Sequence, residues 1–240
     1  MRTKLLALAI GGAAMFGTLG AAAPSQALEP QRTIAQANSE SKVNPDEIQA
    51  LLTKFLVPEG QQKDLIKKAK QGLKWDVYDL AAAPVSVEHD RIIDGMNYTI
   101  KRYPDGSIAA QGIEVPQIVD PNTPSPMAIH NCNITTGSGY AAYRNCQIDG
   151  IWGTVLLGAY GVNFTLVNGA FDSIGSVGAG FQKCIAPTSC STPSQVLFSP
   201  QEGVGPAYSR WQSDVNAPWA SWNVWVQLNV GGNTYWQTNS

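Results

Sequence analysis

Five tryptophans fall within 26 residues near the C-terminal end of the sequence, and they are the residues best suited to ligand chemistry. An exposed indole ring can stack on the apolar face of a sugar, because its flat surface is apolar while its N–H remains a donor. Uncharged amides lie between these tryptophans and could bind hydroxyl groups without requiring a charged ligand. The tryptophans are Trp211, Trp219, Trp222, Trp225 and Trp236, and the amides are Asn216, Asn223, Gln227, Asn229, Asn233 and Gln237.

Alternation along residues 221–230 divides these side chains between the two faces of a predicted strand. Trp222 shares its face with three aliphatic residues, so we expect it in the core. Trp225 shares the opposite face with amides, so we expect that face to be exposed. The predicted ligand-binding residues are therefore Trp225, Asn223, Gln227, Trp236 and Trp211.

Catalytic chemistry has few candidates, and we assign no catalytic residue. His89 and His130 are the only imidazoles, and the sequence lacks both H-E-x-x-H and G-x-S-x-G. A hydrolase that uses His130 with a nearby serine or carboxylate is an alternative, since triads are defined by geometry. Asp149 and Asp172 could form an acid pair for glycoside hydrolysis, but Asp149-Gly150 is also typical of a hairpin turn. No cofactor is predicted, because no phosphate-binding loop occurs.

Four cysteines favour two disulfides over a metal site. An even number of cysteines in an exported chain indicates disulfides, whereas zinc sites commonly contain C-x2-C spacing, which is missing here. Three connectivities are possible. We favour Cys132–Cys146 and Cys184–Cys190, because each pair brackets a short segment with turn residues.

The charge of the chain is low and unevenly distributed. Charged residues make up 14% of the 240 residues, and the formal net charge is -2, which excludes a strongly basic nucleic-acid-binding protein. Residues 130–240 carry very few of these charges, which favours an uncharged ligand for that half. They are Asp149, Asp172, Glu202, Asp214, Arg144, Lys183 and Arg210.

The N-terminus is typical of a secretory signal peptide, predicted over residues 1–27. Arg2 and Lys4 precede an apolar run, and Ser25-Gln26-Ala27 offers a cleavage site, with Ala23 as the alternative. Several glycines interrupt the run, so a membrane anchor is disfavoured and no membrane span is expected in the mature protein. The predicted location is extracellular, and the predicted partner is an extracellular or cell-surface ligand, with a polysaccharide as a candidate and nucleic acid excluded.

The predicted fold is mainly β, and its N-terminal part is a small α+β segment over residues 44–115. Residues 28–43 are polar and are predicted to be flexible. Asn44-Pro45 begins a helix that stops before Pro58, and a second helix follows to Gln71. Turn sequences then separate the strands of a three-stranded meander. These strands are predicted at Val85–Ile93, Met96–Tyr103 and Ser107–Val115.

Residues 116–129 are rich in proline and predict a linker. After the linker, about eight short strands with regular turn signals predict an antiparallel β-sandwich over residues 130–240, stabilised by the two disulfides.

Three short motifs resemble uncharacterised secreted proteins of high-GC Gram-positive bacteria. They are Tyr103-Pro104-Asp105-Gly106-Ser107-Ile108, Asn145-Cys146 and Val230-Gly231-Gly232-Asn233-Thr234. The resemblance implies an extracellular location and no particular activity. The sequence thus predicts a secreted binding module. The second hypothesis is an exported precursor in which residues 28–115 act as a prosegment. The third is a hydrolase that uses His130.

Overall fold

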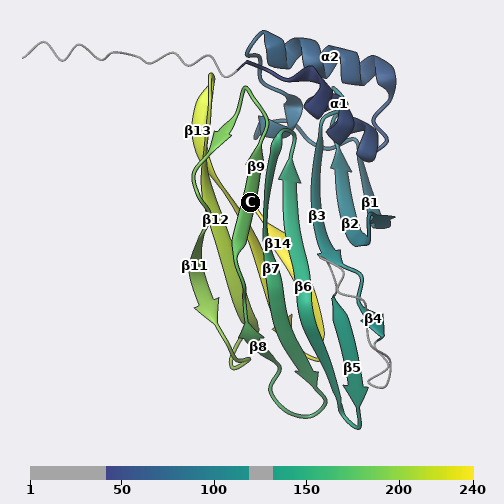
Figure 1. The fold of residues 1–240 in the computed structure, drawn as a ribbon, viewed down its shortest axis with the longest axis vertical. Coiled ribbons are helices and arrows are strands. Elements are labelled where there is room, and N and C mark those ends of the chain that lie inside the picture. The colour runs from purple at the N-terminus through teal and green to yellow at the C-terminus, as the bar shows by residue number, and fades with distance from the viewer. Residues whose placement is uncertain (1–41, 119–131) are drawn as a thin grey trace, which may run out of the picture. The chain divides into compact units, whose positions relative to one another are not determined.

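In the computed structural model, which describes residues 42–118 and 132–240, two β-sheets pack face to face and two helices cover part of the first sheet (Figure 1). This arrangement confirms the predicted mainly β fold with two preceding helices. The helices are α1 (Pro45–Lys54) and α2 (Glu59–Lys70), followed by a short 3-10 helix at Asp76–Tyr78. The first sheet contains β1 (Ser86–Ile93), β2 (Met96–Arg102), β3 (Ile108–Glu114), β4 (Gln117–Ile118), β5 (Asn133–Gly137), β6 (Tyr140–Trp152), β7 (Val155–Val167), β8 (Ser173–Ser176) and β9 (Gly180–Cys184). The second sheet contains β10 (Ser189–Cys190), β11 (Ser194–Ser199), β12 (Ala207–Ala217), β13 (Ala220–Gly231) and β14 (Thr234–Asn239).

The long strands β6 and β7 form the centre of the first sheet. β6 pairs with β3 and β5 along one edge and with β7 along the other, and β7 also pairs with β8 and β9. In the second sheet, β10 and β11 both pair with β12, which is followed by β13 and β14. Neighbouring strands are antiparallel, apart from the parallel pair β4 and β5. The inward side chains of both sheets form one apolar core.

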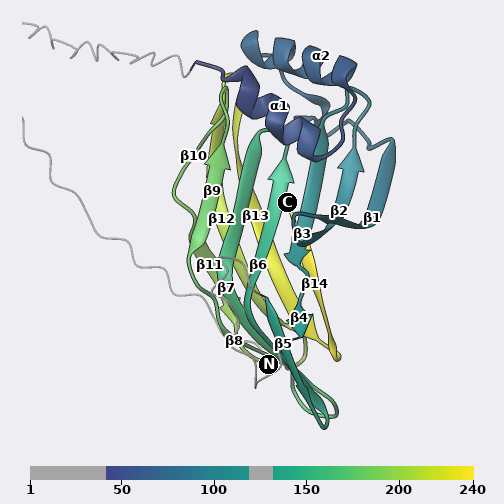
Figure 2. The ribbon, with the colours of Figure 1, turned by 45° about the vertical axis from the view of Figure 1, so that its right-hand side comes forward.

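The helical hairpin forms where the capping and periodicity signals place it. The Asn44 side chain accepts a hydrogen bond from the Asp46 N–H at 3.1 Å, and Ile48 and Leu52 are buried one turn apart. α2 ends before Gly72, whose positive φ of 67° suits a residue without a side chain. Together with Tyr98 of β2, the helices bury a second apolar core on the face of the first sheet that points away from the second sheet (Figure 2).

The predicted α+β segment over residues 44–115 and the predicted β-sandwich over residues 130–240 share one sheet in the structure. The meander strands lie within one residue of their predicted bounds, but β3 pairs with β6 from Ala109↔Trp152 to Ile113↔Ile148. The described residues therefore belong to one compact unit. The physical reason is that the edge of β3 has backbone groups to pair, and that Ile151 and Ile185 complete the core beneath the helices.

Asp149-Gly150 is not a hairpin turn, in contrast to the expectation from sequence. Both residues lie inside β6, and the chain turns instead at Gly153, where φ is 53°. Packing requires glycine at position 150, because a Cβ there would come within 2.7 Å of the Trp152 and Val226 side chains.

The predicted disulfide pairing is confirmed for both bonds. Cys132–Cys146 ties the start of the β5 segment to β6 and is buried in the core. Cys184–Cys190 connects the end of β9 in the first sheet to β10 in the second sheet. The second bond thus holds the two sheets together at one edge.

Several sequence predictions fall on residues that the structure does not describe. The signal peptide, most of segment 28–43, His130 and residues 119–129 of the predicted linker lie outside the described residues. Within the two described ranges, neither helix is long and apolar enough to cross a membrane.

Candidate functional site

Four of the five predicted ligand-binding residues lie on the outward face of the second sheet. Asn223, Trp225 and Gln227 alternate along β13 with buried residues, and Gln227 lies directly opposite Arg210 of β12. Trp236 of β14 lies opposite Asn229 and is 40% exposed. The register of β12, β13 and β14 therefore brings these side chains to one face.

Polar groups on this outward face are largely engaged with one another. The Arg210 guanidinium lies over the Trp225 ring at 4.0 Å from its centroid, and Arg210 Nε donates to Gln227 Oε1 at 2.7 Å. Gln227 Nε2 donates in turn to Asn229 Oδ1, and Asn223 donates to Asp214. The guanidinium therefore covers the Trp225 ring, which was predicted to face solvent. Arg210 was missed because its contact depends on cross-strand register.

Trp211 and Trp222 do not share this outward face. Trp211 is only 9% exposed and packs in the core between the sheets. Trp222 points inward as predicted, but it is half-buried because it lies near the end of the sheet. The tryptophans of residues 211–236 are thus divided among the core, the outward face and a third location.

That third location is a cleft of about 750 Å³ between the β12–β13 hairpin and residues 74–82, which precede the meander. Of its five aromatic lining residues, three have neighbouring rings, one from the segment before β1 and two from the hairpin. The Tyr78 ring centroid lies 5.6 Å from that of Trp219 and 5.3 Å from that of Trp222. Ser221 and Asn239 add uncharged polar groups to the lining. We call this the aromatic cleft.

Tyr78 is held in the aromatic cleft by its hydroxyl group. The hydroxyl donates to the Trp152 carbonyl at 2.9 Å, accepts from the Thr154 N–H at 2.8 Å, and lies 2.8 Å from Thr154 Oγ1. Burial raises the pKa of Tyr78 to about 12, although the hydrogen bonds with Thr154 oppose the shift. The neutral hydroxyl therefore fixes the ring against the β6–β7 turn.

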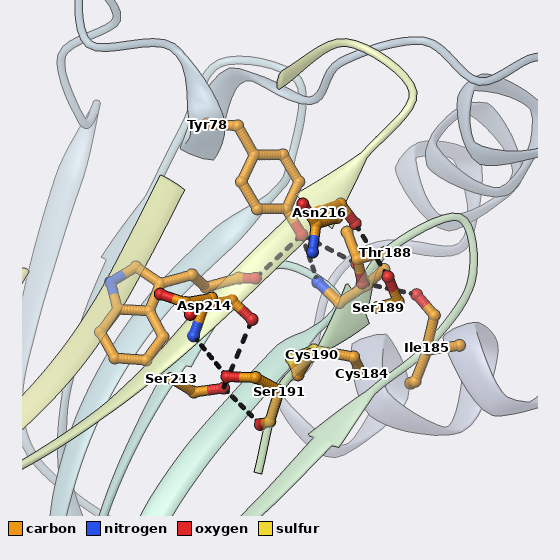
Figure 3. Close-up of a disulfide and its surroundings, with 12 residues drawn as sticks. Tyr78, Cys184, Ile185, Thr188, Ser189, Cys190, Ser191, Ser213, Asp214 and Asn216 are labelled. Carbon is orange, nitrogen blue, oxygen red and sulfur yellow. Dashed lines mark hydrogen bonds between the residues drawn. A yellow bond between two sulfur atoms is a disulfide. The ribbon is translucent and has the colours of Figure 1, made fainter. Parts of the chain in front are cut away.

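A chain of hydrogen bonds continues from Tyr78 to the loop closed by the Cys184–Cys190 disulfide (Figure 3). Thr154 Oγ1 lies 3.0 Å from Thr188 Oγ1, which donates to the Ile185 carbonyl at 2.8 Å. Beyond the disulfide, the Ser213 hydroxyl donates to the Ser191 carbonyl at 2.7 Å. Hydrogen bonds of this loop and the adjoining Ser191 thus link Tyr78 to Thr154 next to β7 in the first sheet and to Ser213 of β12 in the second sheet.

Charged groups are few at the aromatic cleft. Lys74 and Asp79 form an ion pair at 3.3 Å, and Lys101 is the other charged side chain among the described lining residues. The Ala81 N–H, and then Lys74, hold the pKa of Asp79 below its ordinary value. The charged side chains of the described lining are therefore two lysines and one ion-paired carboxylate.

The acidic pair considered for hydrolysis is not brought together. Asp149 is buried beneath Tyr98, whose hydroxyl donates to Asp149 Oδ2 at 3.1 Å. Asp172 is buried at a junction of loops, where it accepts from the N–H groups of Val167 and Asn233, both at 2.7 Å. Each carboxylate thus serves a separate structural contact.

The aromatic cleft was not predicted from the sequence because its two halves are far apart in the chain. Trp219 and Trp222 belonged to the tryptophan group, but Tyr78 lies more than a hundred residues earlier. The only sequence signal was the aromatic pair Trp75 and Tyr78 in a segment without a clear predicted element. The two rings lie 6.4 Å apart in the structure.

Comparisons with known proteins include a distant structural neighbour. No family model matches the sequence, and no curated protein matches it. A crystal structure of a hypothetical protein from Listeria monocytogenes EGD-e is similar with a TM-score of 0.33 and 12% identity, covering 60% of this chain and 94% of that chain. A similarity at this level supports no inference about function.

Proposed function

We propose that this protein is an exported binding module that holds a carbohydrate in the aromatic cleft. The observation that carries the proposal is the convergence of Tyr78, Trp219 and Trp222 on one concave surface. A volume of about 750 Å³ lies within the range of small-molecule sites, which are mostly apolar and aromatic with a few polar groups.

The chemistry of the cleft favours a sugar over a charged ligand. Aromatic faces can pack against the C–H groups of a sugar ring, and Ser221 and Asn239 can exchange hydrogen bonds with its hydroxyls. Trp219 Nε1 is buried at this wall, and no acceptor for it lies in the part of the chain that the structure describes.

Export is supported by two independent features. The N-terminal sequence has the charge and apolar pattern of a signal peptide. Both disulfides form in the structure, and such bonds persist in oxidising compartments outside the cytosol.

The proposal is tested by screening the protein on a glycan array and on insoluble polysaccharides, followed by calorimetry with each glycan that binds. Trp219→Ala should weaken binding by roughly thirtyfold or more, because loss of a central aromatic contact commonly costs about 2 kcal/mol. Trp236→Ala is the matched control, since Trp236 is exposed on the outward face of the second sheet and should leave binding unchanged.

With Trp225→Ala added, these variants distinguish the cleft from the outward face predicted from sequence. If Trp225→Ala and Trp236→Ala abolish binding while Trp219→Ala does not, the outward face is the site and the cleft proposal is wrong. If no glycan binds the wild-type protein, the carbohydrate assignment is overturned.

A further inference from the structure

The edge strand β11 has an unusual combination of exposure and composition. It pairs with β12 on one side, and no described strand pairs with its other side. Its sequence Ser-Gln-Val-Leu-Phe-Ser contains no charge, and Pro193 and Pro200 flank it. Three consecutive apolar residues are exposed, with Val196 at 42%, Leu197 at 43% and Phe198 at 46%. Such an edge offers free backbone groups and apolar area together.

Other long edges of the described structure are protected. β1 carries Glu88, Asp90 and Arg91, and charged side chains disfavour pairing with another strand. β14 lies against the first sheet, where the Gln237 carbonyl accepts from Gln111 Nε2 at 3.5 Å. β11 differs from β1 and β14 because it combines an unpaired edge with an uncharged run of exposed apolar residues.

We propose that β11 pairs antiparallel with β11 of a second copy of this chain, about a two-fold axis at its centre. This register places Ser194 opposite Ser199, Gln195 opposite Phe198, and Val196 opposite Leu197 of the other copy. The strand therefore meets a partner of its own length and polarity, and no like charges are brought together. A two-fold axis makes both surfaces identical and closes the assembly as a dimer.

Both faces of the joined sheet gain apolar contacts in this arrangement. Leu197 lies opposite Arg210, whose side chain is on the outward face, and Phe198 lies opposite the buried Ser209. The two apolar side chains thus point to opposite faces, where each can cover part of the other copy. A bulge between Gln195 and Leu197 twists the strand, so we expect a short intermolecular ladder and a concentration-dependent dimer.

Sedimentation velocity over a wide concentration range tests the proposal. The wild-type protein should shift from monomer to dimer with increasing concentration, and Leu197→Lys should remain monomeric because it places like charges near the axis. Ile92→Lys is the matched control on β1, where an exposed apolar residue is also replaced, and it should dimerise like the wild type.

Hydrogen exchange supplies a measurement that needs no variant. Among residues 195–198, the amides that point away from β12 should become protected as concentration rises, while those of β1 should not change. A wild-type protein that remains monomeric at every concentration overturns the proposal, as does a dimer that Ile92→Lys disrupts and Leu197→Lys does not. Neither measurement depends on glycan binding, so a failure of the dimer proposal can be distinguished from a failure of the proposed function.

Discussion

The Tyr78 hydroxyl and the Asp149 carboxylate are both polar groups in the protein interior, but they differ in how many of their hydrogen bonds are made. The Tyr78 hydroxyl has hydrogen-bond partners on the β6–β7 turn. Asp149 Oδ2 accepts from Tyr98 and Gln147, whereas Asp149 Oδ1 has no partner among the described residues. Burial raises the pKa of Asp149 to about 7, against the opposing effects of Tyr98, Lys54 and Gln147.

We predict that Asp149 makes the folded protein less stable as pH rises. Its folded pKa of about 7 lies above the ordinary value of 3.8, so folding favours the protonated form. This contribution is fully present below about pH 4 and is lost as pH rises through 7, with a slope of at most about 1.4 kcal/mol per pH unit. Asp149→Asn should flatten the pH dependence of the free energy of unfolding measured by urea denaturation, and should exceed wild-type stability at alkaline pH.

The control for this prediction is Asp64→Asn on the exposed face of α2, which should leave the pH dependence as in the wild type. An Asp149→Asn protein that loses stability with rising pH as steeply as the wild type would show that another group is responsible.

We predict that Tyr78→Phe lowers stability without removing the wall of the aromatic cleft. The substitution keeps the ring but leaves the Thr154 N–H and the Trp152 carbonyl without their partner, which should cost about 1–3 kcal/mol. Thermal unfolding measures the loss. Tyr103→Phe, at another tyrosine of the cleft lining, is the control, and an equal loss in both variants would contradict the assigned role of the Tyr78 hydroxyl.

At the scale of elements, local signals in the sequence predicted the helices, the meander and the disulfides well. The cap at Asn44, the turns around the meander and the spacing of the cysteines are each set by a few neighbouring residues. The prediction of a turn at Asp149-Gly150 was wrong because β6 continues through these residues, where it pairs with β3 on one side and β7 on the other. Contacts such as Arg210 on Trp225 follow from register, which no local signal specifies.

We predict that removing the Cys184–Cys190 disulfide weakens the aromatic cleft as well as the fold. The double variant Cys184→Ser/Cys190→Ser should lose about 2 kcal/mol of stability in the chain-entropy view. Because Thr188 in this loop contacts Thr154, hydrogen exchange should also increase at Thr154 and Thr188. Increased exchange confined to residues 184–190 would mean that the loop and the cleft are independent.

At the scale of the whole molecule, the central feature is the pairing of β3 with β6. It joins the helices and meander to the sandwich through both backbone hydrogen bonds and a shared core. This connection bears on the prosegment hypothesis, because a cut in residues 119–131 would leave the two parts paired.

We predict that the two parts stay associated after such a cut. With a specific protease site inserted between Asn122 and Thr123, both fragments should elute together in native gel filtration and separate only in denaturant. Fragments that separate under native conditions, with residues 130–240 still folded by circular dichroism, would support a removable prosegment.

The grouping of Tyr78, Trp219 and Trp222 has an optical consequence. Rings from two distant segments lie 5.3–5.6 Å apart, close enough for their electronic transitions to couple. The near-ultraviolet circular dichroism of the protein should therefore carry a signal that exists only when the hairpin and residues 74–82 are assembled. A change in this circular dichroism signal on addition of a ligand would therefore measure binding in the cleft without an added label.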